Sequence, residues 1–376
     1  MLPFLLACTP DDDAPGKLRQ SDPGETDDTG TPPVADGCRA TPAPADRDRV
    51  VAVSLPYDED AGRSNAWALL VLTADGELRD DGARVEMGRG YAGEVVFTPD
   101  GSLGLVAQED GTVGVFSPDG EVISTGVDGF YASRVVMDPS GEVAWVIDGN
   151  WVNNGGGVYR LPLDCETGEP GEPERVVEAK LPADLLLTGE EAVLVGLDVE
   201  GAEAGDDAAL LTWGDDPAFV DGADAFGDDD AIVSDATLFD GFALIADNSE
   251  FSGVPTRVAV LAVGEALEPV EVVQMEDPVA LLPAGDLVLV LSGYGDAVLA
   301  LARDGDGFTS LGEVAGSALP GAGAVVSRGP LAGRVLVAEV EGIRMLRVTG
   351  EDVEDLGLTT LGAGYTGIPG AIGVQP

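Results

Sequence analysis

Two oxygen-rich loops carry the residue types in this sequence that are best suited to chemistry. One loop contains Asp148, Asn150 and Asn153, and the other contains Asp304 and Asp306. Closely spaced carboxylate and amide oxygens are the ligands that Ca²⁺ prefers in proteins. Both loops are therefore candidate calcium sites, and the alternative for each is a solvated turn that binds nothing.

The first of these loops also contains Trp151. An exposed tryptophan offers a flat apolar face on which a ligand can stack, so Trp151 is a candidate ligand-binding residue. Two further acidic groups could hold a cation, although runs of acids are most often simply solvated. They are Asp228, Asp229, Asp230 and Asp235 in one group, and Asp247, Asn248, Ser249 and Glu250 in the other.

The absence of histidine limits the catalytic options. The chain has no histidine among its 376 residues, which removes the commonest general base and the usual nucleophilic triads. Any catalysis has to use carboxylates, Lys, Tyr or a bound cation, and no catalytic residue is assigned. With 69 acids, 19 bases and a net charge of −50, the chain would repel a phosphate backbone. Nucleic-acid binding is therefore not expected.

The amino-terminal residues predict where the protein is located in the cell. Residues 1–7 are apolar, and Leu5-Leu6-Ala7-Cys8 resembles the lipobox of bacterial lipoproteins. The resemblance implies a signal over 1–8, a lipid on Cys8 and, because Thr9 follows the cysteine, sorting to the outer membrane. Residues 9–48 are rich in Pro, Gly and Asp without periodicity, which predicts a disordered acidic linker. The alternative is a disordered terminus with an incidental cysteine.

A pattern of short apolar runs and turn residues repeats along 49–376. In the clearest copy, the runs between residues 95 and 125 are separated by Pro99-Asp100-Gly101, Asp110-Gly111 and Pro118-Asp119-Gly120. Asp-Gly supplies the positive φ angles of tight hairpins, and a preceding proline presets the turn. The copy therefore predicts four short antiparallel strands. Similar passes follow one another about every 40–50 residues, a period typical of propeller blades.

Seven such passes account for residues 49–376, but the first lacks an innermost strand. Gly364-Tyr365-Thr366-Gly367 echoes Gly90-Tyr91-Ala92-Gly93, so the end of the chain is expected to supply that strand. The prediction is an all-β, seven-bladed propeller of four-stranded antiparallel blades, closed by a C-terminal strand that joins the first blade. Through its Pro-Asp-Gly and Pro-Ser-Gly turns the sequence resembles WD40-like and YVTN-type propellers.

Two cysteines remain after Cys8, namely Cys38 and Cys165. In an exported protein a leftover pair of cysteines indicates a disulfide, which here would pin the linker onto the propeller. The alternative is two unpaired thiols.

Function is left between two main hypotheses. The leading one is an exported, lipid-anchored and monomeric propeller of the cell envelope that binds a protein or glycan partner without catalysis and meets the membrane only through its lipid. The alternative is a calcium-dependent hydrolase or lactonase with its site in the propeller channel, because lactonase-type propellers resemble this chain and some hold Ca²⁺. An assembly scaffold is a third reading. Convergent oxygens in the channel would favour chemistry, whereas small apolar residues would favour a scaffold.

Overall fold

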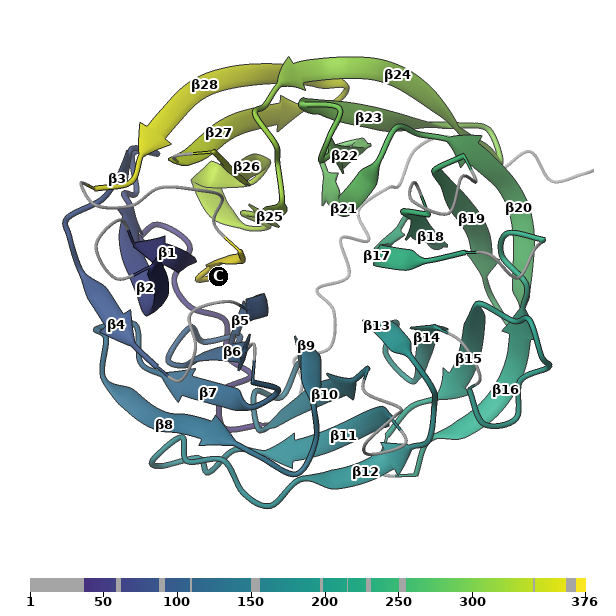
Figure 1. Cartoon of the computed structure of the whole chain (residues 1–376), viewed down its shortest axis with the longest axis horizontal. Coiled ribbons are helices and arrows are strands. Elements are labelled where there is room, and N and C mark those ends of the chain that lie inside the picture. The colour runs from purple at the N-terminus through teal and green to yellow at the C-terminus, as the bar shows by residue number, and fades with distance from the viewer. Residues whose placement is uncertain are drawn as a thin grey trace, which may run out of the picture. The chain divides into compact units, whose positions relative to one another are not determined.

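Seven antiparallel sheets stand in a ring, as the computed structural model shows (Figure 1). The structure describes residues 37–58, 62–87, 92–108, 110–149, 156–196, 199–214, 216–227, 231–249, 255–340, 342–362 and 370–376. Six sheets have four strands. The seventh has five, because two short outer strands both pair with the same neighbouring strand. The predicted all-β, seven-bladed propeller is confirmed.

The strands of each blade follow one another from the channel outward. Blade one contains β29 (Ile372–Val374), β1 (Arg49–Asp58) and β2 (Gly62–Leu72), with the short outer strands β3 (Leu78–Arg79) and β4 (Arg84–Glu86). Blade two contains β5 (Ala92–Phe97), β6 (Gly104–Gln108), β7 (Val113–Phe116) and β8 (Val122–Val127). Blade three contains β9 (Ala132–Met137), β10 (Val143–Asp148), β11 (Gly157–Pro162) and β12 (Glu174–Val177). Blades four and five are β13 (Pro182–Leu187), β14 (Glu191–Gly196), β15 (Ala208–Thr212), β16 (Ala218–Ala223); and β17 (Val233–Phe239), β18 (Phe242–Asp247), β19 (Arg257–Val263), β20 (Leu267–Gln274). Blades six and seven are β21 (Pro278–Ala284), β22 (Leu287–Ser292), β23 (Ala297–Asp304), β24 (Gly307–Gly316); and β25 (Ala322–Val325), β26 (Arg334–Glu339), β27 (Gly342–Thr349), β28 (Asp352–Thr360), with the short 3-10 helix η2 (Gly329–Leu331) between β25 and β26.

The hydrophobic core lies between neighbouring blades. The second strand of a blade is covered on both faces. All six residues of β22 are therefore buried, and all but Ser292 are apolar. Outer strands such as β28 face solvent and carry the acids. One cluster joins Leu244 and Val260 of blade five to Leu281 and Val288 of blade six. This packing fixes each inner strand against the next one around the ring.

The chain ends close the ring in the first blade. The inner strand β29 pairs with β1 through Val374 and Val51, and through Ile372 and Val53. The buried side chain of Gln375 accepts the Val50 N–H at 3.1 Å and donates to the Gly101 carbonyl at 2.5 Å, which ties blade one to blade two. The predicted closure is confirmed, although residues 364–367 lie outside the described part of the chain. Closure gives the first blade an inner strand, as in the other six blades.

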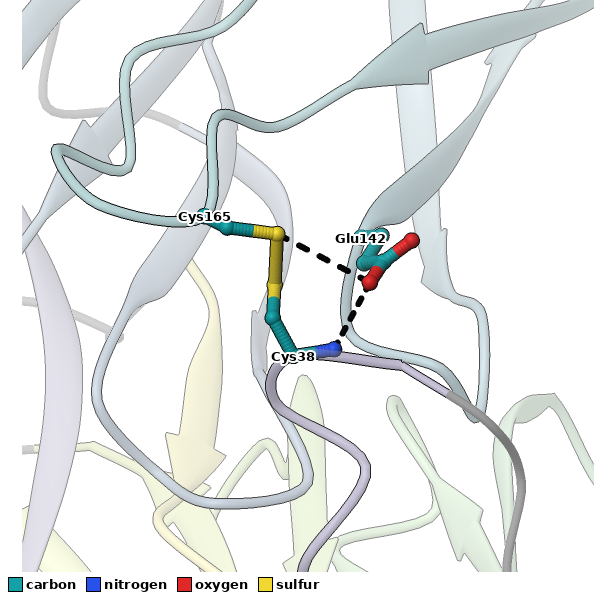
Figure 2. Close-up of side chains that lie close together, drawn as sticks. All are labelled: Cys38, Glu142 and Cys165. Carbon is teal, nitrogen blue, oxygen red and sulfur yellow. Dashed lines mark hydrogen bonds between the residues drawn. A yellow bond between two sulfur atoms is a disulfide. The ribbon is translucent and has the colours of Figure 1, made fainter.

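Residues 37–48, the end of the predicted linker, lie along the propeller. Cys38 and Cys165 form a disulfide with a Cα–Cα distance of 5.8 Å, as predicted (Figure 2). Beside it, Glu142 accepts the Cys38 N–H at 2.7 Å, and the buried Arg39 donates to the Asp164 and Cys165 carbonyls at 2.7 and 3.1 Å. Because both sulfurs are bonded to each other, this group of Cys38, Cys165 and Glu142 is not a metal site.

Removing the disulfide is expected to lower the free energy of unfolding by about 3 kcal/mol, since the closed loop spans 127 residues. The Cys38→Ser/Cys165→Ser double variant and the reduced wild type should show the same loss in urea unfolding. A wild type whose unfolding midpoint is unchanged by reducing agent would show that the bond does not constrain the chain.

Candidate functional site in the central channel

Two adjoining cavities lie on the axis of the propeller. The larger has a volume of about 610 Å³ and is lined by residues at the start of the inner strands of blades three to six, together with loop residues near them. The smaller, of about 350 Å³, lies further along the inner strands. The two cavities share four lining residues, Arg134, Val279, Gly321 and Gly370. They are therefore neighbouring parts of one channel.

Four charged side chains from four consecutive blades meet at this channel. Each comes from an inner strand and stands immediately before an apolar stretch of that strand: Glu94 in β5, Arg134 in β9, Asp184 in β13 and Asp235 in β17. Equivalent positions of successive blades come to the same level because the blades repeat around one axis. The fold thus gathers charges that lie 40 to 51 residues apart in the chain.

Arg134 is at the centre of the group. Its Nη1 atom donates to Asp184 and, at 2.6 Å, to Asp235. Its Nε atom lies 3.7 Å from Oε2 of Glu94. The Arg134 side chain is 18% exposed and the Glu94 side chain 33%, so both still face the channel. We refer to these four residues as the channel cluster.

The carboxylates of the channel cluster also hold neighbouring blades together. Each carboxylate accepts a backbone N–H from the next blade. The donor is the residue one position after the equivalent of the carboxylate residue in that blade. Glu94 accepts from Val135. Asp184 accepts from Ala236 at 3.2 Å, and Asp235 accepts from Leu281 at 2.6 Å. With the Arg134 bonds and the Leu185 N–H, which Asp184 accepts at 2.7 Å, both oxygens of Asp184 and of Asp235 are engaged.

Burial and mutual repulsion shift the proton affinities in the cluster. Burial in the channel wall, with the charges of Asp184 and Asp235, raises the pKa of Glu94 to about 8 against the opposing effect of Arg134. Burial and Asp235 likewise raise the pKa of Asp184 to about 6. Burial lowers the pKa of Arg134, but the three carboxylates outweigh it and hold that pKa well above its usual value. Glu94 is thus mainly protonated at neutral pH and close to its titration point.

One oxygen of the cluster has no hydrogen-bond partner among the described residues. Oε2 of Glu94 is covered from bulk solvent and makes no hydrogen bond there. Its charge partner is Arg134, whose Nε lies 3.7 Å away. The exposed third of the Glu94 side chain, and not this covered oxygen, faces the channel.

A calcium ion, which the resemblance to lactonase-type propellers raised as an option, does not fit the channel cluster. Ca²⁺ takes six to eight oxygen ligands. Here Asp184 and Asp235 already bond the Arg134 guanidinium and backbone N–H groups, which leaves Oε2 of Glu94 as the one cluster oxygen without a hydrogen bond among the described residues. The positive charge of Arg134 would also repel a cation.

The channel wall formed by blades six, seven and one is uncharged and contains many small residues. At the smaller cavity these blades contribute mainly alanine and glycine: Ala280, Gly321, Ala322, Gly323, Gly370 and Ala371. Val279, Leu281 and Leu282 of blade six and Ile372 of blade one also line this cavity. A charged wall from blades two to five therefore faces an uncharged wall of small and aliphatic residues.

The residues predicted from the sequence lie in several places. Asp148 is buried at the end of β10, and the next residue, Gly149, lines the larger cavity. Asp304 and Asp306 are exposed on the β23–β24 hairpin and line neither cavity. Asn150, Trp151 and Asn153 lie outside the described residues, as do Asp228, Asp229, Asp230 and Glu250. As calcium or ligand sites, all of these residues stay predictions.

Two acids from the weaker groups have defined partners. Asp247 is buried, accepts the Ile232 N–H and is paired with Arg257, both at 2.8 Å. Asp235, which the sequence grouped with the neighbouring acids 228–230, belongs instead to the channel cluster. Asp247 thus holds the loop before β17, whereas Asp235 faces the channel.

Glu94, Arg134 and Asp184 were missed by sequence reasoning. A signal was present, because each is a charged residue directly before the apolar run of a predicted inner strand: Glu94-Val95-Val96, Arg134-Val135-Val136 and Asp184-Leu185-Leu186. Aligning the repeats on these runs would have stacked the charges in one column.

Among the described residues no helix has the length and apolarity to cross a membrane.

Comparison with known proteins supports the fold. No protein-family model and no curated protein matches the sequence. Solved structures do match. The periplasmic gluconolactonase PpgL of Pseudomonas aeruginosa is 17% identical with a TM-score of 0.59, over 85% of this chain and 98% of that one. A putative 6-phosphogluconolactonase of Bacteroides uniformis is 12% identical with a TM-score of 0.61, over 87% and 99%. One from Bacteroides fragilis is 12% identical with a TM-score of 0.58, over 89% and 99%. At these identities the likeness shows a shared seven-bladed fold.

Proposed function

We propose that this protein hydrolyses a small cyclic ester in the central channel of the propeller. The observation that carries the proposal is the channel cluster, in which a carboxyl group of raised pKa and an arginine line the cavity of about 350 Å³. A carboxyl group that titrates near neutral pH is suited to general acid–base catalysis. The convergent oxygens favour chemistry over the scaffold reading.

The chemistry needs no metal. Ionised Glu94 takes a proton from a water molecule, whose oxygen forms a bond to the carbonyl carbon of the lactone. The positive charge of Arg134 stabilises the oxyanion that develops. The ring C–O bond then breaks, and Glu94 returns its proton to the departing alkoxide oxygen. The product is one hydroxy acid for each lactone and water consumed.

The solved structures add support of a general kind. Two of those that share this fold are putative 6-phosphogluconolactonases, and one is a periplasmic gluconolactonase. Propellers host many activities, so the fold alone does not carry the function. The proposal for this chain rests on its own channel residues, and the likeness is consistent with a lactone as substrate.

A non-catalytic binding module for a protein or glycan is the second candidate. One observation favours it: Asp184 and Asp235 each accept a backbone N–H from the next blade. On this reading the channel cluster joins blades and has no reactive role. The net charge of −50 would then attract a basic partner.

Hydrolysis by the purified protein distinguishes the candidates. Titration of released acid with D-glucono-δ-lactone and δ-valerolactone, corrected for spontaneous hydrolysis, should show turnover by the wild type. Turnover should be unchanged by a chelator, because the channel cluster does not fit Ca²⁺. Absence of turnover with every lactone would leave the binding module as the better candidate.

We also propose that the protein works outside the cytoplasm. The Cys38–Cys165 disulfide supports this location, since such bonds persist in oxidising compartments.

The lipid on Cys8 and the outer-membrane location rest on the lipobox resemblance alone. Labelling of cells with a tagged fatty acid should mark the wild type and not the Cys8→Ala variant. Equal labelling of both would overturn the anchor.

A further inference from the structure

We infer that the substrate carries an apolar chain beside its lactone ring, and that the larger cavity holds this chain. The inference rests on the proposed function and names its substrate class. It follows from the lining of the larger cavity, the exposed side chains at its mouth and the volume it offers beyond the channel cluster.

The side chains that line the larger cavity are mostly apolar. Those from blades four to six include Leu181, Pro182, Ala231, Ile232, Val233 and Val279. The cluster residue Arg134 also lines this cavity, which is where it adjoins the smaller one. A molecule in the channel thus meets the charged cluster in the smaller cavity and mostly apolar side chains in the larger one.

The hydroxyl groups of the larger cavity are already engaged. Ser133 Oγ donates to the Ile147 carbonyl at 3.0 Å, and Ser234 Oγ donates to the Pro278 carbonyl at 2.7 Å. Each hydroxyl has one proton to donate, so neither offers a donor to a ligand. A polyhydroxylated chain would find only acceptors at these two hydroxyls, whereas an alkyl chain needs no hydrogen-bond partner there.

Two large apolar side chains stand exposed at this cavity. Leu181 is 45% exposed and Ile232 is 55% exposed. Leu181 has a φ of +49°, in the left-handed region that a leucine occupies only at a cost in free energy. Asn or Gly would suit that backbone better, so the leucine is not explained by local conformation. A ligand chain that covers both side chains explains their position.

The volume is consistent with a substrate larger than a bare ring. Pockets for drug-sized ligands span about 300–1,000 Å³. The cavity of about 350 Å³ at the channel cluster is enough for the lactone ring, and about 610 Å³ remains for its substituent. Apolar burial then adds to affinity with each methylene.

The test is a series of δ-lactones that differ only in alkyl chain length: δ-valerolactone, δ-octalactone and δ-decalactone. The wild-type kcat/KM should rise by about twofold to fourfold for each added methylene that is buried. D-Glucono-δ-lactone, whose substituents are hydroxyls, should be a poorer substrate than δ-decalactone. A kcat/KM that is flat or falls along the series would overturn the inference while leaving lactone hydrolysis intact.

Variants at the mouth locate the effect. The Leu181→Asn/Ile232→Ser double variant should lower the ratio of kcat/KM for δ-decalactone to that for δ-valerolactone by at least about fivefold, since two apolar contacts of the chain are lost. Leu311→Asn is the matched control, because Leu311 is 44% exposed on the outer strand β24, and it should leave this ratio unchanged. An unchanged ratio in the double variant would place the chain elsewhere.

Binding keeps the inference testable if no lactone is hydrolysed, an outcome that would reject the proposed function. Calorimetry with the ring-opened acids 5-hydroxydecanoate and 5-hydroxypentanoate then measures the chain effect directly. Tighter binding of the longer acid, lost in the Leu181→Asn/Ile232→Ser variant, supports an apolar-chain site. Equal affinities, or binding of neither acid, would overturn it.

Discussion

Replacing Arg134 with methionine should lower the free energy of unfolding by about 3–5 kcal/mol at neutral pH. Arg134 neutralises Asp184 and Asp235, and its loss leaves two buried carboxylates close together without a counter-charge. Urea unfolding of the wild type and of Arg134→Met measures the loss. The loss should shrink as the pH falls, because protonated carboxyls no longer repel each other.

A compensated variant separates charge from packing. Arg134→Met/Asp184→Asn/Asp235→Asn removes the guanidinium together with the negative charges, and it should recover most of the stability lost in Arg134→Met. If Arg134→Met unfolds within about 1 kcal/mol of the wild type, or if the compensated variant is no better, the three charges do not form one unit.

Replacing Glu94 with glutamine should reduce lactone hydrolysis by about 10²–10⁴-fold in kcat/KM, the usual effect of removing a general base. Glutamine keeps the size of the side chain and an oxygen that can accept the Val135 N–H. The variant should therefore fold. Glu121→Gln is the matched control, because Glu121 is exposed in the turn before β8, and it should keep full activity.

The pH dependence gives this prediction a second readout. Glu94 acts as a base when ionised, so the wild-type kcat/KM should rise with pH and level off above about 8. Glu94→Gln should lack that inflection. A Glu94→Gln enzyme with wild-type activity and an unchanged pH profile would exclude the proposed role.

The same group makes stability depend on pH with a definite sign. The pKa of Glu94 is raised in the folded protein from 4.5 to about 8, so folding favours its protonated form. Its contribution to stability is complete below about pH 4.5 and is lost as the pH rises through about 8. Unfolding of Glu94→Gln, compared with the wild type, should show the variant gaining in relative stability over this range.

The fold could be predicted from local chemistry because turns specify their own neighbours. Pro99-Asp100-Gly101 and Pro139-Ser140-Gly141 each join an inner strand to the next strand, and such hairpins need only adjacent residues. The closing strand is predictable because the first repeat lacks one element. Cys38 and Cys165 can be paired because no other cysteine remains in the folded part.

Residues that are neighbours in the chain do not reveal the channel cluster. Asp235 stands near the acids 228–230 in the chain, yet its partner Arg134 is 101 residues away, and Asp184, which shares that arginine, is 51 residues away. The repetition of the blades around one axis brings these distant positions to one level. The register also shifts by one residue before Asp184 and before Asp235, which a count of repeat lengths does not reveal.

A crystal structure of Glu94→Gln with bound δ-decalactone would locate the site most directly. We expect the lactone ring beside Arg134 and the alkyl chain over Leu181 and Ile232 in the larger cavity. Density for the ligand on an outer hairpin such as β23–β24, or an empty channel at a lactone concentration that saturates the wild type, would contradict a catalytic site in the channel.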